Sequence, residues 1–266
     1  MKSFLILFAG HVGSSWLCSM LNSHDENFHV AFEPFMQIQN KRKKKKIDEE
    51  LEKRIKNQFA KLIFANPSMN KISSDLTQYN KYINFYKENS EFDSKISANI
   101  EYKYVFFKAR ITELTPYIQN QLIPNKNVLL IYLYRQNKIK QAVSNIKRLQ
   151  MNLGHFKNKE VSPPVSINPE LILKVANKFS DKDSLSEAFF ESVNTKKIKT
   201  SYEDLLTNLD IELEKIGSFL DIDLKSEKLK ASYQKVTKDN LAEALENYEE
   251  VKAFFENSKY EECFEK

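Results

Sequence analysis

Short apolar runs alternate with longer segments of helical spacing along most of this chain. Segments of strand length occur at 3–9, 28–32, 104–109, 127–134 and 196–201, and all of them except the last are mainly apolar. Apolar residues recur at helical intervals across 14–23, 47–64, 111–121, 138–151, 169–193 and 202–220, and the tail has the same spacing. Strands that alternate with helices favour a parallel sheet covered on both faces. The pattern therefore predicts a three-layer α/β fold.

We expect residues 1–266 to form a single domain, because neither an internal repeat nor a linker interrupts the pattern. A chain of 266 residues with 41% hydrophobic content suits one α/β core. The region 36–100, between the second and third strands, predicts a helical and loop insert. The proline-containing stretch 152–168 predicts a loop.

The first predicted strand ends in a glycine turn that leads into a helix. The turn and the first helical residues are Gly10, His11, Val12, Gly13, Ser14, Ser15 and Trp16. Because a helix N-terminus presents unpaired N–H groups and the positive end of the dipole, this P-loop-like arrangement favours a phosphate or sulfate. The alternative is an ordinary strand-to-helix turn with a serine cap. The spacing differs from that of nucleotide-triphosphate and dinucleotide loops.

A second anion contact is predicted at Arg135. This residue follows the apolar run 128–134 and precedes the helix pattern of 138–151. The carboxyl end of a buried parallel strand faces the crevice where open α/β sheets bind ligands. A guanidinium at that position suits a second phosphate.

These segments resemble the cofactor motifs of sulfotransferases that use 3′-phosphoadenosine 5′-phosphosulfate (PAPS). Residues 11–18 resemble the family's Arg/Lys-x-Gly-Ser/Thr-Thr/Ser loop, with His11 in place of the cation. The segment from Arg135 to Ser144 resembles the 3′-phosphate motif, in a form like that of bacterial trehalose and nodulation-factor (carbohydrate) sulfotransferases. Residues 200–206, followed by 216–220, and residues 247–251, followed by 258–261, are similar to the family's later segments.

The resemblance implies that PAPS is the donor and that adenosine 3′,5′-bisphosphate (PAP) is the product. Because neither a Walker Lys-Ser/Thr pair nor a metal-binding aspartate accompanies the loop, we expect no metal. The loop 10–16 would hold the 5′-phosphosulfate, Arg135 and Ser144 would hold the 3′-phosphate, and Tyr202 would stack near adenine. A core position is the alternative for Tyr202. The implied reaction transfers a sulfuryl group to a hydroxyl of a carbohydrate or glycolipid, with 36–100 and 152–168 shaping the acceptor pocket.

Three residues are candidates for catalysis. Glu33 ends the second strand between Phe32 and Pro34, where apolar neighbours raise a carboxyl pKa, and the family's catalytic glutamate resembles it in position. Its alternative is a water-exposed strand end. Lys108 ends an apolar strand and resembles a family lysine that faces the reacting centre; the alternative is a snorkelling surface lysine. His11 would stabilise the leaving phosphate, or else be a solvent-facing loop histidine.

Charge and cysteine content narrow the class of protein. The net charge of +5 comes from 41 Lys and Arg against 36 Asp and Glu, without the basic stripes or motifs of nucleic-acid binding. The basic run 41–46 predicts a solvated loop, with docking on a membrane surface or other polyanion as the alternative. Two cysteines, Cys18 and Cys263, suggest neither disulfides nor a metal site and indicate a reducing, cytoplasmic compartment.

The N-terminal run 4–9 resembles a signal peptide, but it is short and leads straight into the glycine turn, so we expect a strand. No apolar run approaches membrane-spanning length. Two other functions remain open. One is a catalytically weak module that binds adenosine bisphosphate, which His11 makes plausible. The other is a kinase-like phosphotransferase, which would require magnesium and a Lys-Ser/Thr pair after the turn. Oligomeric state and acceptor identity are not predicted.

Overall fold

The computed structural model describes residues 2–24, 28–30, 35–36, 48–64, 104–125, 128–151, 163–230 and 240–264. Several features predicted from the sequence lie outside these ranges: Glu33, the basic run 41–46, most of the insert 36–100 and most of the loop 152–168. Among the residues described, every helix is too short or too polar to traverse a bilayer.

Five parallel strands form the sheet, which confirms the predicted α/β class. Within the described residues these strands are β1 (Lys2–Phe8), β2 (Phe28–Val30), β3 (Tyr104–Ala109), β4 (Leu129–Tyr134) and β5 (Lys197–Ser201), in the order β2-β3-β1-β4-β5. The central strand β1 pairs with β3 through Leu7 and Ala109, and with β4 through Phe8 and Leu133. The carboxyl ends of these three strands therefore meet at one edge of the sheet.

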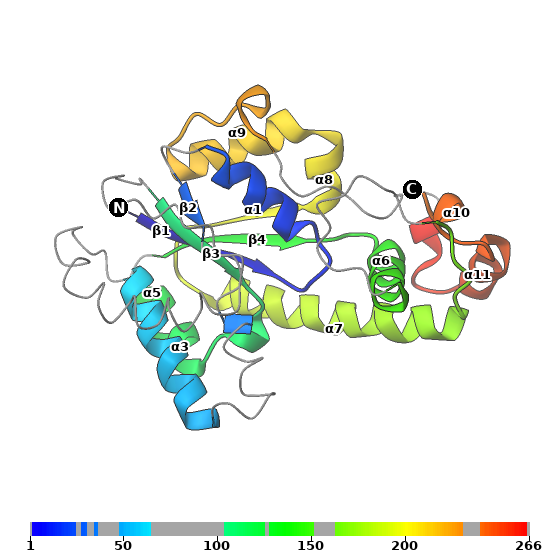
Figure 1. Cartoon of the computed structure of the whole chain (residues 1–266), viewed down its shortest axis with the longest axis horizontal. Helices are drawn as coiled ribbons and strands as arrows, with labels where there is room; N and C mark the ends of the chain where they lie inside the picture. Colours follow the sequence, from blue (N-terminus) through cyan, green and yellow to red (C-terminus); the bar gives the residue numbers. More distant parts are fainter. Residues whose placement is uncertain are drawn as a thin grey trace.

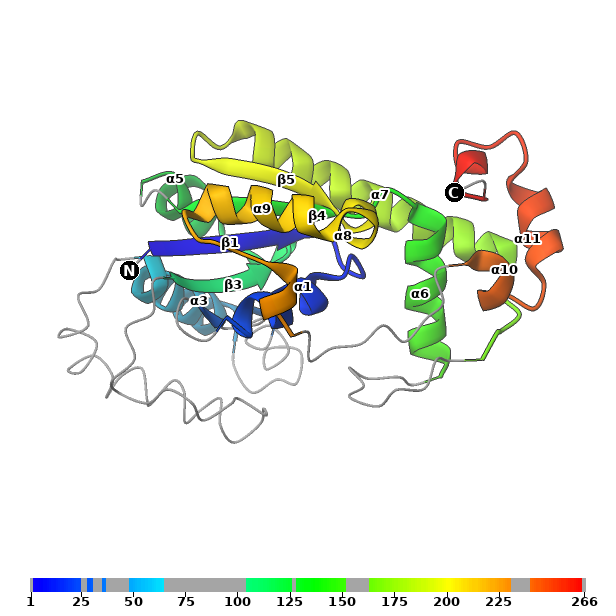
Figure 2. The same cartoon turned by 90° about the horizontal axis from the view of Figure 1, so that it is seen from above.

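Helices cover both faces of the sheet, as the alternating pattern predicts. Helices α1 (Ser14–Asn22) and α9 (Leu209–Leu220) lie on one face, and α3 (Glu49–Phe64) and α7 (Pro169–Ser192) lie on the other (Figures 1 and 2). The side chains of β1 alternate between two apolar cores. Phe4, Ile6 and Phe8 pack in the core on the α1 and α9 side, whereas Leu5 and Leu7 pack in the other.

A third apolar cluster lies beyond the carboxyl edge of the sheet, at the right of Figure 1. Helix α6 (Lys138–Gln150) packs there against α7, α10 (Leu241–Ala244) and α11 (Tyr248–Phe255). Within it the buried ammonium of Lys147 donates to the carbonyls of Pro163 at 2.7 Å and Ala244 at 3.3 Å. These contacts hold α6 in place beside the strand ends.

Two predicted helices are wrong in detail. The segment 111–121 is a 3₁₀ turn (Ile111–Glu113), then a π-helix (Ile118–Leu122) and a short α5 (Ile123–Asn125). Pro116 has no N–H to continue the first turn, and the Thr115 hydroxyl accepts from the Ile118 N–H at 3.3 Å to start the next.

The segment 202–220 is two helices, α8 (Tyr202–Thr207) and α9, separated by Asn208. Asn208 has φ −134° and ψ 48°, outside the helical region. Short amide side chains favour such non-helical positions over helix interiors. The break leaves α8 as a short turn that follows the end of β5 and carries Tyr202 and Glu203.

Candidate functional site

The turn between β1 and α1 requires its glycines. Gly10, His11 and Gly13 all have positive φ, at 111°, 52° and 73°. A Cβ on Gly13 would lie 2.4 Å from a ring carbon of Tyr202, so no other residue fits there without moving that ring. Gly13 is also the N-cap of α1. Because Gly13 has no side chain, its backbone lies directly against the ring of Tyr202, the first residue of α8.

Lys108, near the end of β3, brings a positive charge to the start of α1. Its side chain is only 2% exposed, and its Nζ donates to Ser15 Oγ at 2.7 Å and Ser14 Oγ at 3.2 Å. The same ammonium lies 5.1 Å from the centre of the Phe8 ring. Lys108 is thus a buried lysine on both predicted serines and not a snorkelling surface lysine.

Arg135, at the end of β4, lies on the other side of the same turn. It is 5% exposed, and its Nη1 donates to the His11 carbonyl at 3.4 Å. The guanidinium lies 4.7 Å from the centre of the Tyr202 ring, and its Nε is 3.7 Å from Glu203 Oε1. Burial lowers the pKa of Arg135, while Tyr202 and Glu203 raise it. Because an arginine pKa starts so high, the group stays charged.

Glu203 fixes the backbone that carries Arg135. Its two carboxylate oxygens accept from the N–H groups of Gln136 at 2.9 Å and Asn137 at 3.1 Å. A carboxylate at a helix start is favourable, and here it also faces the Arg135 guanidinium. Glu203 was not predicted as a site residue, although it follows Tyr202 in one of the segments that resemble the family.

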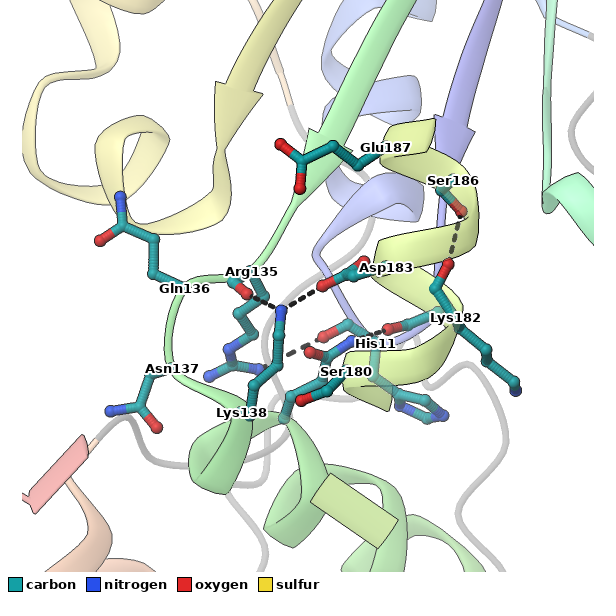
Figure 3. A network of polar contacts seen from close by, with 12 residues as sticks. His11, Arg135, Gln136, Asn137, Lys138, Ser180, Lys182, Asp183, Ser186 and Glu187 are labelled. Atoms are coloured by element: carbon teal, nitrogen blue, oxygen red, sulfur yellow. Dashed lines mark hydrogen bonds and ion pairs between the residues drawn. The ribbon is translucent and has the colours of Figure 1, made fainter. Parts of the chain in front are cut away.

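Lys138 holds the same turn from the opposite side, as Figure 3 shows. Its Nζ donates to the Arg135 carbonyl and to the carboxylate of Asp183, which is buried on α7. The Tyr132 hydroxyl donates to the other carboxylate oxygen at 3.3 Å. Burial raises the pKa of Asp183, and the Lys138 charge opposes that rise. Burial and the Asp183 charge also raise the pKa of Tyr132.

Two polar side chains of α6, four residues apart, contact the glycine turn. The Gln141 amide donates to the Gly10 carbonyl, and Asn145 Nδ2 lies 2.6 Å from His11 Nε2. Ser144 lies three residues after Gln141, a spacing that puts these two side chains next to each other on one face of α6. The spacing of Gln141 and Asn145 is the signal from which this contact could have been predicted, because buried amides in a helix need partners.

Lys108 and His11 contact different parts of the site. The His11 imidazole contacts Asn145 and lies edge-on to Phe179, with 5.8 Å between ring centres, on the α6 and α7 side of the turn. Lys108, from β3, is the cation that reaches Ser14 and Ser15. The proposed part of His11 in catalysis stays a prediction.

The Tyr202 ring packs against the Arg135 guanidinium. It is buried, contacts the backbone at Gly13 and meets Trp16 edge-on with 6.4 Å between ring centres. These contacts support its core role, and stacking near adenine stays a prediction. Glu33 lies outside the described residues, so the predicted base is not placed.

The lysine of this network yields a first test. Lys138→Met removes the tie to the Arg135 carbonyl and leaves Asp183 buried without its cation. We expect the free energy of unfolding to fall by about 2 kcal/mol near neutral pH, measured by urea unfolding. If the turn binds PAP, as the sequence resemblance implies, its affinity should fall about tenfold, measured by calorimetry. Loss of Lys138 raises the Asp183 pKa further, so the folded state binds that proton more tightly than the unfolded chain. The stability deficit should therefore shrink as pH falls.

Asp183→Asn in the Lys138→Met background provides the control, because it removes the unpaired charge. Stability at neutral pH should recover while PAP affinity stays low. If the loss of unfolding free energy in Lys138→Met did not change with pH, Asp183 would not be the group that this variant leaves without a partner charge.

No protein-family model matches this chain, and no curated protein matches it. Similar solved structures include the sulfotransferase domain from the curacin biosynthetic pathway, at 15% identity over 88% of this chain and 79% of that chain, with TM-score 0.43. Another is the sulfotransferase domain from the Synechococcus PCC 7002 olefin synthase, at 13% identity over 100% of this chain and 86% of that chain, with TM-score 0.45.

Mouse sulfotransferase SULT7A1 complexed with PAP is similar at 13% identity, over 85% of this chain and 61% of that chain, with TM-score 0.42. This chain thus spans less than two thirds of the mouse enzyme. At these identities and TM-scores, the similarities assign no role to any residue. The roles proposed below rest on the contacts within this site.

Proposed function

We propose that this protein is a sulfotransferase that moves a sulfuryl group from PAPS to a hydroxyl acceptor. The observation that carries the proposal is the pair of buried cations on either side of one glycine turn. Lys108 contacts Ser14 and Ser15 at the start of α1, and Arg135 contacts the His11 carbonyl. Each buried charge is costly away from water, and an anion bound at the turn would offset that cost.

The donor set of the site fits a ligand with two separate anionic groups. On one side it offers an ammonium, two hydroxyls and the free N–H groups of a helix start. On the other side it offers the Arg135 guanidinium. Burial lowers the pKa of Lys140, and the Arg135 charge lowers it further. PAPS carries a 5′-phosphosulfate and a 3′-phosphate, and this arrangement suits both.

PAPS supplies the activated sulfuryl group when bound. As the acceptor oxygen bonds to sulfur, the bond from sulfur to the 5′-phosphate oxygen breaks, and that phosphate gains negative charge. Lys108 and the two serine hydroxyls stand where they would stabilise this charge. The acceptor hydroxyl must lose its proton, and we assign that step to Glu33, with His11 as a further proton-carrying group.

Arg135 and Ser144 are proposed to hold the 3′-phosphate. Three contacts fix Arg135. Its guanidinium lies against the Tyr202 ring and the Glu203 carboxylate, and its backbone carbonyl accepts a hydrogen bond from Lys138. Such fixation lowers the entropy lost when a ligand binds. Ser144 lies on the face of α6 that meets the turn.

For the acceptor we propose a carbohydrate or glycolipid, supported by the resemblance of the segment from Arg135 to Ser144 to carbohydrate sulfotransferases. We propose a cytoplasmic site of action because both cysteines are free thiols. Among the described residues, no three His, Cys, Asp or Glu side chains are grouped to hold a metal.

A second candidate is a module that binds PAP without transferring sulfate. The observation that favours it is His11, which replaces the family's permanent cation and whose ring is engaged by Asn145 and Phe179. Binding and turnover separate the two functions, because both bind PAP and only the enzyme consumes PAPS. Calorimetric titration with PAP, adenosine 5′-monophosphate and ATP with magnesium tests the nucleotide site itself.

We expect PAP to bind more tightly than either other nucleotide. Arg135→Met should weaken PAP binding by about thirtyfold, corresponding to about 2 kcal/mol for a charge-assisted contact, and leave adenosine 5′-monophosphate binding nearly unchanged. Arg135→Lys keeps the charge and serves as the matched control. An Arg135→Met variant that still prefers PAP would place the 3′-phosphate elsewhere, and tighter binding of ATP with magnesium would favour a phosphotransferase.

A further inference from the structure

A second group of cations lies on the α7 side of the same turn. Arg110 follows the end of β3, and Lys178 and Lys182 are one helical turn apart on α7. None of the three was predicted from the sequence as a site residue, and none is used by the proposed donor site.

Two of these cations, Arg110 and Lys182, lie around Gly10 and Phe179. A Cβ on Gly10 would lie 3.7 Å from Arg110 Nε and 3.6 Å from a ring carbon of Phe179. Lys182 Nζ lies 5.6 Å from the centre of the same Phe179 ring, and the His11 ring centre lies 5.8 Å from it. Figure 3 shows the Lys182 side chain and the His11 imidazole extending to the same side of α7. The turn is therefore flanked by positive charge on this side as well.

The positive charge in this group is only partly balanced. Arg110 pairs with Glu113, whose carboxylate accepts from Arg110 Nη1 and from its backbone N–H, each at 3.0 Å. Within the part of the chain that the structure describes, no carboxylate forms an ion pair with Lys178 or Lys182. The nearby Asp183 carboxylate faces Lys138 and Tyr132 instead.

Burial and the neighbouring charges also make a bound anion favourable at Lys182. Burial lowers its pKa, and the charges of Lys178 and Arg110 lower it further, whereas Glu113 raises it. A half-buried ammonium beside two other cations is destabilised in the free protein. A bound anion would remove that repulsion and recover part of the cost of desolvation.

The group is continuous with the proposed donor site. Lys108 Nζ lies 5.1 Å and Arg110 Cζ lies 5.5 Å from the centre of the same Phe8 ring. A row of cations thus runs from the serines of α1, through Lys108 and Arg110, to Lys182 on α7. In the proposed reaction Lys108 serves the donor, which leaves Arg110 and Lys182 for the other substrate.

We propose that the acceptor is itself an anion, a hydroxyl compound that already carries a carboxylate or sulfate, and that Lys182 and Arg110 bind this group. The inference rests on the proposed sulfotransferase function and adds the acceptor's charge to it. Lys182 and Arg110 determine specificity: they bind a part of the acceptor that does not react. Lys178 adds to the local field and is not required to touch the ligand.

Three titrations of the whole protein test this. The first measures PAP binding, and the second measures inorganic sulfate binding to the PAP-saturated protein. The third compares 4-nitrophenyl β-D-glucuronide with 4-nitrophenyl β-D-glucoside, also with PAP bound, because this pair differs only at C6, where a carboxylate replaces a hydroxymethyl group. Variants are Lys182→Gln, Lys108→Met and, as the control, Lys174→Gln, an exposed lysine two turns away on α7.

We expect Lys182→Gln to weaken sulfate binding about tenfold, the loss of one charge-assisted contact, and to remove a preference for the glucuronide. PAP affinity should be unchanged in Lys182→Gln, and Lys174→Gln should match the parent in every titration. Sulfate binding that depends on Lys108 but not on Lys182 would place the anion at the donor site and overturn the inference.

Failure of the inference and failure of the proposed function give different results. Equal binding of the two glycosides by the parent, or no sulfate binding at all, would overturn the anionic acceptor while PAP binding still upheld the donor site. Absence of PAP binding would overturn the proposed function, and the acceptor assignment with it.

Discussion

Replacing Lys108 with methionine is expected to lower turnover by about a hundredfold or more, the usual loss when a preorganised group that stabilises transition-state charge is removed. Methionine keeps most of the apolar stem against Phe8 and removes only the ammonium that donates to Ser14 and Ser15. PAP affinity should fall less than turnover, because charge on the departing phosphate is greatest in the transition state. Single-turnover rates and calorimetry measure the two effects separately.

Lys147→Met is the matched control for this variant. Lys147 is also a fully buried lysine, but its ammonium donates to the carbonyls of Pro163 and Ala244, away from the turn. It should lose stability and keep the parent's turnover below its unfolding temperature. Equal losses of turnover in the two variants would mean that burial of a lysine, and not its place beside the serines, accounts for the effect.

Gly13→Ala is expected to lower PAP affinity by about a hundredfold and to destabilise the fold by about 3 kcal/mol. The added Cβ would meet the Tyr202 ring at 2.4 Å, on a residue whose φ is already 73°. Relief of that clash requires movement of Tyr202, which lies under the Arg135 guanidinium. A single methyl group thus disturbs both proposed phosphate contacts.

Gly217→Ala separates the loss of stability from the loss of binding. A Cβ on Gly217 would lie 2.5 Å from the Ile222 carbonyl, a comparable clash, at the end of α9. It should destabilise the protein, as urea unfolding would show, without changing PAP affinity. If Gly13→Ala bound PAP as tightly as Gly217→Ala, the turn would not be the nucleotide site.

The parts of the site that the sequence predicts are those fixed by local order along the chain. A strand, a glycine turn and a helix occur in sequence at residues 3–23, and their geometry follows from that order alone. Arg135 and Lys108 each stand at the end of an apolar strand, and parallel pairing brings such ends to one edge of the sheet. Their meeting at the turn is thus predictable once the sheet is parallel.

The contacts that hold these residues in place were not predictable in the same way. Asp183 and Lys138 are far apart in sequence and meet only because α7 packs against α6. Glu203 reaches the turn after β4 because β5 pairs with β4, with Tyr134 opposite Ser201, and α8 begins directly after β5. The side of the turn on which the His11 ring lies depends on φ 52° at a residue that is not glycine.

Turnover of PAPS in the presence of candidate acceptors decides whether this chain transfers a sulfuryl group to a hydroxyl. The parent protein and Lys108→Met would be incubated with PAPS and a panel of neutral and acidic sugars, glycolipids and small alcohols, with products identified by mass spectrometry. We predict formation of PAP together with an acceptor that has gained one sulfuryl group, in the parent and far less in the variant. Tight PAP binding by a parent that leaves PAPS intact with every acceptor would contradict the enzyme and support the binding module.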